Sequence, residues 1–234
     1  MHPFVVVIYG AIGVGKSSVV ETLSDNDDKT VGRRRHDIVC VREPVEAMRK
    51  SGALQSVSES ASSSGYDLQM LVLSERLSTY WHVQALIRRR DIDRPTIIVS
   101  DGHLELDQWI FVDEHVNAGR MSLNEYELYK SCVPFAMSHS PPFMRCPHVY
   151  IYLHATPAEL LRRVQQRGRS EERSLDVNAL HRVVKACDVL TTRLATNPTS
   201  VVVTVRTDGV SCDSVVSSVR DIISQEYSTF TTIA

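Results

Sequence analysis

The chain has 234 residues, of which 43% are hydrophobic and 23% charged, and its formal net charge is −2. This near balance argues against a protein that binds nucleic acid polymers, and the apolar share excludes a disordered acidic protein. Of the 26 basic residues, 21 are arginines, whose planar guanidinium matches phosphate and carboxylate oxygens. The excess of arginine is compatible with anion chemistry, although codon bias is the simpler explanation.

The sequence has no run that approaches the roughly 20 apolar residues of a membrane span. Its N-terminus lacks the charged and apolar regions of a signal peptide. The five cysteines are widely spaced and include no Cys-x-x-Cys pair, which fits a reducing compartment. We therefore expect a cytoplasmic protein without a membrane partner, located in the host cytoplasm if it is viral.

Strands and helices are predicted to alternate along the chain. The apolar run 4–9 predicts a strand buried on both faces, followed by a glycine-rich turn and a helix over 17–23. Further strands are predicted over 37–42, 96–99, 148–153 and 200–205, and helices over 66–90, 104–117, 123–137 and 176–194. The alternation predicts an α/β fold with a five-stranded parallel sheet covered by helices on both faces.

Three local features complete this prediction. Thr156-Pro157 starts another helix, with Thr156 as the N-cap and Glu159 reaching back to complete a capping box. The serine-rich stretch 56–65 predicts a mobile surface loop, and residues 226–234 a flexible tail. With no internal repeat and no domain boundary, residues 1–234 are expected to form a single domain.

A phosphate-binding loop follows the first predicted strand. Gly10-Ala11-Ile12-Gly13-Val14-Gly15-Lys16-Ser17 matches G-x-x-x-x-G-K-[ST] in full and lies between a strand and a helix. Backbone N–H groups of this loop and of the helix start, through Ser18, would surround phosphate oxygens. Lys16 would bridge the terminal phosphates, and the Ser17 hydroxyl would hold Mg²⁺. The segment Asn-Lys-x-Asp of GTPases is absent, which leaves a small-molecule kinase or a nucleotide-gated regulatory module.

Carboxylates follow two of the other predicted strands. Glu43 stands after the second strand in Glu43-Pro44-Val45, and Asp101 after the third. The carboxyl edge of a parallel sheet faces the ligand crevice, so Asp101 could hold Mg²⁺ directly or through water. Farther along, Arg163, Arg167 and Arg169 lie where a helix passes through a glycine into a predicted lid.

Several of these segments together resemble the deoxynucleoside kinases. The resemblance rests on Glu43-Pro44-Val45, Leu68-Gln69, residues 101–111 and Arg167-Gly168-Arg169-Ser170-Glu171-Glu172, and it extends from about residue 4 to about residue 194. The family includes cellular deoxycytidine, deoxyguanosine and mitochondrial thymidine kinases, together with the herpesviral thymidine kinases.

The resemblance implies a P-loop kinase fold with an arginine-rich lid, and transfer of the γ-phosphoryl group of ATP to the 5′-hydroxyl of a deoxynucleoside. Such a kinase serves nucleotide salvage for DNA synthesis and uses Mg²⁺. Glu43 would be the base, and Arg163, Arg167 and Arg169 would close over the transferred phosphoryl group. A homodimer through the long helices is also expected.

The resemblance further implies a nucleoside site. Glu172 would bind the sugar 3′-hydroxyl, Gln69 would present its amide to the base edge, and Phe111 would stack beside the base or sugar. The residues by themselves leave simpler interpretations open. Glu43 could only cap the next helix, Gln69 could face solvent, the lid arginines could lie on a solvated helix face, and Phe111 could belong to the core.

Arg76 and Asp107 bear on the choice of base. Arg76 lies two helical turns after Gln69, and the family places Arg and Asp at these positions in its deoxycytidine and purine kinases. A carboxylate accepts from an exocyclic amino group, whereas the O4 of thymine would oppose it, so we expect deoxycytidine or purine deoxynucleosides. The alternative is that Arg76 and Asp107 pair only with each other or are exposed.

The sequence departs from the family pattern in three places. Gly102 stands where the family usually has an arginine, Met48 replaces a usual tryptophan, and the tyrosine expected upstream of Gln69 has no clear counterpart except Tyr66. These departures suit a viral enzyme and keep thymidine, or broad pyrimidine use, open. A nucleoside monophosphate kinase and a nucleotide-binding regulatory protein without turnover are further alternatives.

Overall fold

The computed structural model describes residues 3–28, 37–59, 61–89 and 96–233. Its centre is a parallel sheet of five strands, in the order β2-β3-β1-β4-β5. The strands are β1 (Phe4–Tyr9), β2 (Asp37–Val41), β3 (Thr96–Asp101), β4 (Val149–His154) and β5 (Val201–Arg206). The predicted α/β fold with a five-stranded parallel sheet is therefore confirmed, and each strand lies within two residues of its predicted bounds.

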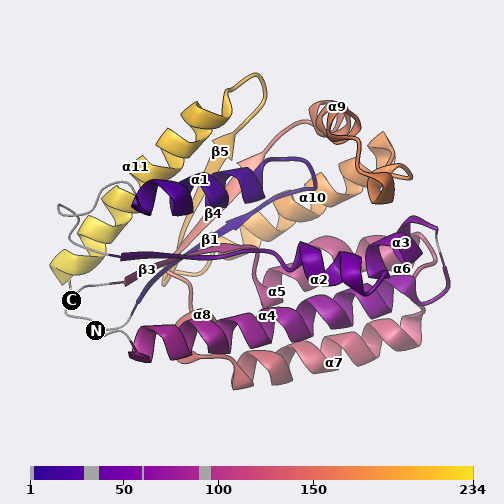
Figure 1. Ribbon diagram of the computed structural model, residues 1–234, viewed down its shortest axis with the longest axis horizontal. Helices are drawn as coiled ribbons and strands as arrows, with labels where there is room; N and C mark the ends of the chain where they lie inside the picture. The colour runs from indigo at the N-terminus through magenta and orange to yellow at the C-terminus, as the bar shows by residue number, and fades with distance from the viewer. Residues whose placement is uncertain (1–2, 29–36, 60, 90–95, 234) are drawn as a thin grey trace.

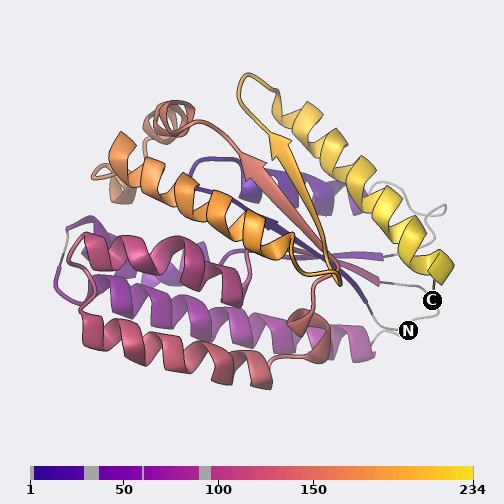
Figure 2. The ribbon, with the colours of Figure 1, turned by 180° about the vertical axis from the view of Figure 1, so that it is seen from behind.

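The helices cover both faces of this sheet (Figures 1 and 2). They are α1 (Lys16–Asp28), α2 (Val45–Lys50), α3 (Ala53–Ser58), α4 (Ser64–Arg89), α5 (Leu104–Asp107), η1 (Gln108–Val112), α6 (Asp113–Asn117), α7 (Leu123–His139), α8 (Pro142–Arg145), α9 (Pro157–Arg167), η2 (Ser170–Glu172), α10 (Val177–Leu194) and α11 (Cys212–Ile233). Helices α1 and α11 pack together on one face, while α10 lies on the other and contacts η1 and α6, and the long helices α4 and α7 pack against each other.

The core follows from the apolar runs of the central strands. Every residue of β1 and β3 is buried, as expected for parallel strands with helices on both sides, whereas the edge strand β5 alternates between exposed and half-buried residues. Because the central strands are parallel, their carboxyl ends lie at one edge of the sheet. The residues that follow β1, β2 and β3 are thereby brought to the same place.

Three local predictions differ from the structure. Within the stretch 56–65, residues 56–58 end α3 and residues 64–65 begin α4, so it is not a loop throughout. Residues 226–233 belong to α11, and the rings of Tyr227 and Phe230 contact Phe4 at centroid distances of 5.5 and 5.2 Å. Serine and threonine are weak helix formers, and the apolar contacts of both segments outweigh that weakness.

The capping box at the start of α9 is also not completed. The Thr156 side chain accepts from the backbone N–H of Glu159, as predicted. The backbone N–H of Thr156, however, donates to Asp208 at 2.8 Å, and the Glu159 carboxylate accepts instead from Arg162 and Arg163. A partner distant in the sequence thus replaces the local one. Within the described ranges, no helix is long and apolar enough to cross a membrane.

Candidate active site

The glycine-rich loop 10–17 joins the end of β1 to the start of α1. Gly10 has a φ of +148°, and a Cβ atom at this position would lie 2.4 Å from the carbonyl oxygen of Leu153. Only glycine lets the loop pass so close to β4. The Lys16 ammonium donates to the carbonyl oxygens of Gly10 and Ala11, at 3.0 and 3.3 Å, so it lies folded back over the loop.

Ser17 and Asp101 meet beneath this loop. The Ser17 hydroxyl donates to Asp101 Oδ2 at 2.9 Å, while Asp101 Oδ1 is buried without a hydrogen-bond partner among the described residues. Burial and the nearby Glu43 charge raise the pKa of Asp101, and Lys16, Arg76 and Ser17 partly oppose that rise. The hydroxyl of Ser17, an exposed residue, and the buried Asp101 carboxylate with one oxygen unpaired are the hard oxygen donors that Mg²⁺ prefers.

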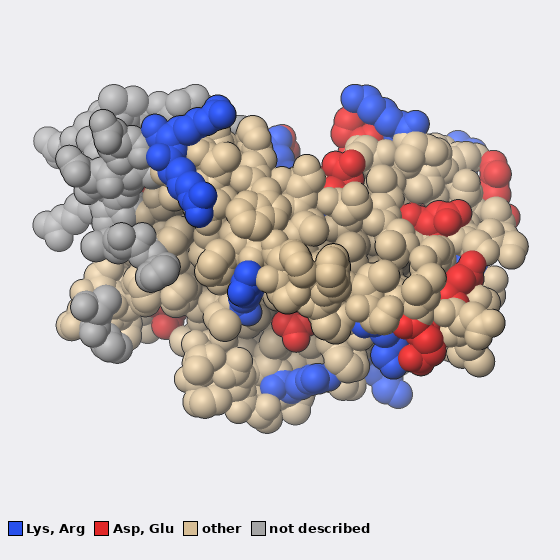
Figure 3. Space-filling view, turned by 90° about the horizontal axis from the view of Figure 1, so that it is seen from below, with Lys and Arg blue, Asp and Glu red and all other residues tan. Residues whose placement is uncertain are grey.

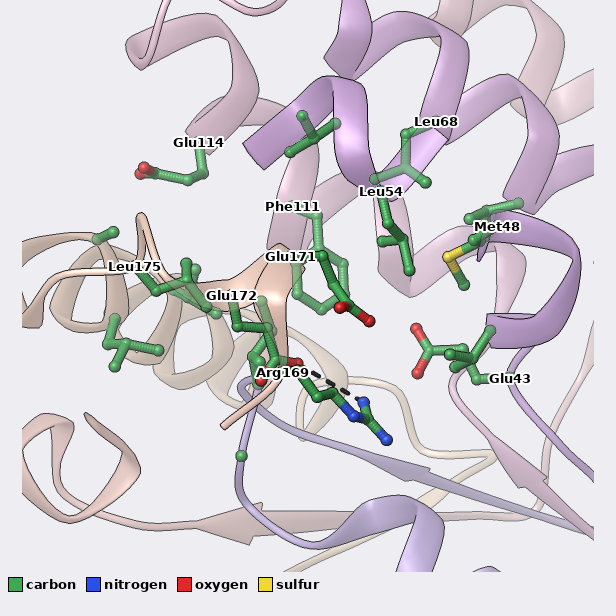
Figure 4. A pocket seen from close by; sticks show the side chains of 18 of the residues that line it. Glu43, Met48, Leu54, Leu68, Phe111, Glu114, Arg169, Glu171, Glu172 and Leu175 are labelled. Atoms are coloured by element: carbon green, nitrogen blue, oxygen red, sulfur yellow. Dashed lines mark ion pairs between the residues drawn. The ribbon is translucent and has the colours of Figure 1, made fainter. Parts of the chain in front are cut away.

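Glu43 lies two residues beyond the end of β2. The helix that follows has Pro44 as its N-cap residue and no side-chain cap hydrogen bond, so the interpretation of Glu43 as only a helix cap is wrong. The side chain is half-buried and points into a cavity from the side opposite Glu171 and Glu172 (Figure 4). Met48 lines the same wall, where the family usually has a tryptophan.

Arg76 and Asp107 form an ion pair inside the protein. Arg76 Nε donates to Asp107 Oδ2 at 2.6 Å, and Arg76 Nη1 donates to the backbone oxygen of Asp101 at 2.7 Å. Both side chains are almost completely buried, and Asp107 also lines the cavity, so they pair with each other without being exposed. Burial raises the pKa of the Asp107 carboxyl, and the Arg76 charge offsets part of that effect.

Gly102 explains how this arginine fits. The residue has a φ of +80°, and a Cβ atom there would lie only 2.4 Å from Arg76 Nη2. The arginine that the family usually carries at this position is missing, and the guanidinium of Arg76, which comes from α4, fills the adjoining space. A cation is therefore retained next to Asp101, although it comes from another element.

Gln69 and Phe111 line the same cavity as Glu43. Gln69 is only 4% exposed, so the interpretation that it faces solvent is wrong. Its Nε2 lies 3.3 Å from Nε2 of His115, and its Oε1 is buried without a hydrogen-bond partner in the described part of the chain. Phe111 lies in the π-helical turn η1, where it packs against the core and also borders the cavity, so it does not belong to the core alone.

The lid arginines are held by carboxylates and do not lie free on a helix face. Arg167 Nη2 donates to Glu172 at 2.5 Å, and Arg169 lies 3.6 Å from the same carboxylate (Figure 4). Arg163 lies elsewhere, because it donates to Glu159 and to both oxygens of Thr207. The structure therefore places Arg167 and Arg169 at the Glu43 cavity and Arg163 behind the phosphate loop.

Two cavities meet at the phosphate loop. The first, the Glu43 cavity, is lined by Lys16, Ser17, Glu43, Gln69, Asp107, Phe111, Arg167, Arg169 and Glu172 among others. The second is lined by residues of the loop, of α9 and of the β5–α11 connection, including Gly13, Gly15, Arg162, Arg163, Thr207 and Gly209. Gly13, Gly15, Ser18 and Arg167 border both cavities. Two ligands could thus lie against the same loop.

Sequence reasoning missed several polar residues of the first cavity, among them three in α6 or just after it. Glu114, His115 and Arg120 line it, and no motif marked them. His115 lies one helical turn after Phe111, and that spacing was the available signal that it shares the same face. Arg120 follows the end of α6 and had no comparable signal. Tyr66, considered as a replacement for the missing tyrosine, packs against the core and is not among the residues that line this cavity.

Comparisons with known proteins agree with this arrangement. The family model of the deoxynucleoside kinases matches residues 6–230. A deoxyadenosine/deoxycytidine kinase of Bacillus subtilis (strain 168) is 26% identical over 168 residues, which covers 72% of this chain and 67% of the relative. A solved structure of deoxyadenosine kinase from M. mycoides, with products dCMP and a flexible dCDP bound, matches with a TM-score of 0.69 at 15% identity, covering 95% of this chain and 100% of the other. Because the family model spans nearly the whole sequence, this chain belongs to the deoxynucleoside kinase family and is a nucleoside phosphotransferase.

Proposed function

We propose that this enzyme transfers the γ-phosphoryl group of ATP to the 5′-hydroxyl of a deoxynucleoside, with deoxycytidine and purine deoxynucleosides as its preferred substrates. The observation that carries the proposal is the pair of cavities sharing the phosphate loop. A kinase must place donor and acceptor on either side of the transferred group, and two cavities that share the phosphate loop support such an arrangement. The product would be a deoxynucleoside monophosphate for nucleotide salvage.

The donor side is supported by the loop and its surroundings. Loop N–H groups and Lys16 would hold the phosphates, and the second cavity would accept the rest of the nucleotide. Ser17 and Asp101 would hold Mg²⁺, since a buried carboxylate oxygen without a partner fits a cation there. The ion would supply charge neutralisation on the phosphate oxygens.

The acceptor side is supported by Glu43. Its carboxylate lines the cavity together with Lys16 and Ser17, so a hydroxyl placed there lies beside the phosphate loop. Glu43 would orient that hydroxyl and accept its proton. Glu172 would bind the sugar 3′-hydroxyl, and Phe111 would pack against the base or sugar.

The preference for an amino base is supported by the buried Arg76–Asp107 pair. Arg76 holds one face of the Asp107 carboxylate, and Asp107 remains part of the cavity lining, where it would accept from an exocyclic amino group. Thymine would bring its O4 to the same carboxylate, leaving two acceptors opposed. The B. subtilis relative, named for deoxyadenosine and deoxycytidine, agrees with this preference.

Phosphoryl transfer from ATP labelled in the γ-phosphate tests these statements. The acceptors are the four deoxynucleosides and dTMP, with wild type, Glu43→Gln and the exposed control Glu46→Gln. We expect labelled deoxynucleoside monophosphates from wild type and control, and a kcat about 10²–10⁴-fold lower for Glu43→Gln, with nucleoside affinity retained. Thymidine as the best acceptor, label on dTMP only, or ATP binding without transfer would each overturn the proposal in favour of a thymidine kinase, a monophosphate kinase or a regulatory protein.

We also propose a cytoplasmic homodimer. The face formed by α4 and α7 carries few charges (Figure 3), and its exposed apolar side chains include Trp81, Leu123, Leu128 and Phe135. Exposed apolar side chains gathered on a helical face are typical of subunit interfaces. Sedimentation of the wild type as a dimer, and of Phe135→Asp as a monomer, is the expected result.

A further inference from the structure

The wall of the Glu43 cavity contains a histidine that lies outside the segments on which the family resemblance rests. His115 is 7% exposed and lies between Gln69 and Arg120. Its Nε2 is 3.3 Å from Gln69 Nε2, and its Nδ1 accepts from Arg120 Nε, also at 3.3 Å. The three side chains therefore form a chain of polar contacts that ends at the Gln69 amide, which lines the cavity.

The contacts of Arg120 determine where the proton of His115 lies. A guanidinium only donates, so Nδ1 of His115 must carry a lone pair. Burial and the Arg120 charge lower the pKa of His115 to about 4, which keeps the ring neutral near pH 7. A neutral imidazole has one N–H, and that N–H is consequently on Nε2, facing Gln69.

The proton on His115 in turn determines the orientation of the Gln69 amide. An Nε2–H group needs an acceptor, and the amide NH₂ cannot provide one. Because the two ends of an amide have nearly the same shape, the Gln69 side chain satisfies His115 by presenting Oε1 to it. The NH₂ group then occupies the position of the buried oxygen that otherwise has no partner among the described residues.

The backbone around His115 holds this arrangement in place. Gly65 N donates to the backbone oxygen of Arg120 at 2.8 Å, and Arg120 N donates to the backbone oxygen of His115 at 2.9 Å. A Cβ atom on Gly65 would lie 2.6 Å from His115 Cβ, so the start of α4 is in close contact with α6. The neighbouring Glu114 carboxylate is bound by Arg182, through hydrogen bonds of 2.5 and 2.8 Å, which leaves Arg120 directed at His115.

We propose that His115, oriented by Arg120, is a specificity-positioning residue that fixes the Gln69 amide with its NH₂ group toward the base. This inference rests on the proposed kinase function and sharpens it. A fixed donor matches a ring nitrogen that accepts, as in N3 of cytosine and N1 of adenine. It opposes the N3–H of thymine and the N1–H of guanine, so guanine is rejected although it is a purine with an amino group.

Asp107 would add the second half of the same recognition. Adenine and cytosine both present an acceptor nitrogen next to an exocyclic amino group. The Gln69 NH₂ group would donate to the ring nitrogen, and the Asp107 carboxylate would accept from the amino group, in cytosine as well as in adenine. The predicted substrates are therefore deoxyadenosine and deoxycytidine, and no longer all purine deoxynucleosides.

The test compares deoxycytidine with 3-deazadeoxycytidine, in which a C–H group replaces the ring nitrogen. The proteins are wild type, Arg120→Met and the control Arg88→Met, which removes an exposed arginine near the far end of α4. We expect the wild type and the control to favour deoxycytidine in kcat/KM by about tenfold to a hundredfold. In Arg120→Met both His115 tautomers become available and the amide can turn, so the preference falls to within about threefold. An unchanged preference in a folded Arg120→Met protein would overturn the proposal.

A second measurement does not depend on activity. In protein labelled with ¹⁵N-histidine, the ring signals of His115 are identified by their loss in His115→Phe. We expect a protonated Nε2 and an unprotonated Nδ1 at pH 7 in the wild type, and a proton on Nδ1 would refute the inference. If no deoxynucleoside is phosphorylated, the proposed function fails. The tautomer and the calorimetric affinities for deoxycytidine and 3-deazadeoxycytidine then still decide the role of His115.

Discussion

Replacing Gly102 by alanine should destabilise the protein more than its backbone conformation alone explains. The residue has a φ of +80°, and an alanine in this region costs about 1–2 kcal/mol of folding free energy. The added methyl group would also stand 2.4 Å from Arg76 Nη2, so the guanidinium must move. That movement disturbs the hydrogen bonds of Arg76 to Asp107 and to the backbone of Asp101.

The size of the effect follows from these two contributions. Overpacking of a buried site costs about 1–3 kcal/mol, and complete rupture of a buried ion pair about 3–5 kcal/mol. We therefore expect Gly102→Ala to lose about 2–5 kcal/mol of unfolding free energy. For a protein of this size, each kcal/mol lowers the melting temperature by roughly 2–4 °C.

Gly52→Ala is the matched control. Gly52 has a φ of +77°, and a Cβ atom there would meet nothing within 4 Å, so it reports the conformational cost alone. Urea unfolding of both variants, in the wild-type and Arg76→Met backgrounds, isolates the clash as a coupling energy. If Gly102→Ala costs no more than Gly52→Ala in the wild-type background, the argument that Arg76 fills the space beside Gly102 is wrong.

Two further predictions concern buried charges. Asp107→Asn should lower the unfolding free energy by about 3–5 kcal/mol, because it leaves Arg76 buried without a counter-charge; a loss below about 1 kcal/mol in urea unfolding would contradict the pairing. Burial lowers the pKa of His103 to about 4, so between pH 6.5 and 4 the unfolded chain binds a proton that the folded chain does not. The wild type should therefore lose stability relative to His103→Gln as the pH falls through that range, and a constant difference would contradict a neutral buried imidazole.

The sheet and the phosphate loop could be predicted from the sequence because their signals are local. An unbroken apolar run such as 4–9 has few alternatives to a buried strand, and the loop motif requires the strand before it and the helix after it. Helix α11 was missed because its serines and threonines weaken the local signal. Its aromatic rings become informative only once Phe4 is known to lie beside them.

The candidate site was predictable only in part, because some of its contacts are set by packing and not by a local sequence pattern. Glu43 and Asp101 could be located because strand ends of a parallel sheet converge, and the family resemblance located Gln69. The function of Arg120, by contrast, depends on a contact with His115 and on the start of α4, which are set by packing. No local pattern of the sequence encodes that contact.

The lid illustrates how an expected role and an observed contact can be reconciled. Arg167 and Arg169 are predicted to bind the transferred phosphoryl group, yet both lie at Glu172, in partly exposed ion pairs. Such pairs contribute about 0–1 kcal/mol, whereas a phosphoryl group offers stronger, charge-assisted hydrogen bonds. Because two arginines share one carboxylate, one of them can leave while Glu172 keeps a partner. Arg167→Gln should therefore lower kcat by at least about 10³-fold while changing the unfolding free energy by less than about 1 kcal/mol, and a large loss of stability with normal turnover would show that the ion pair itself is the function of this arginine.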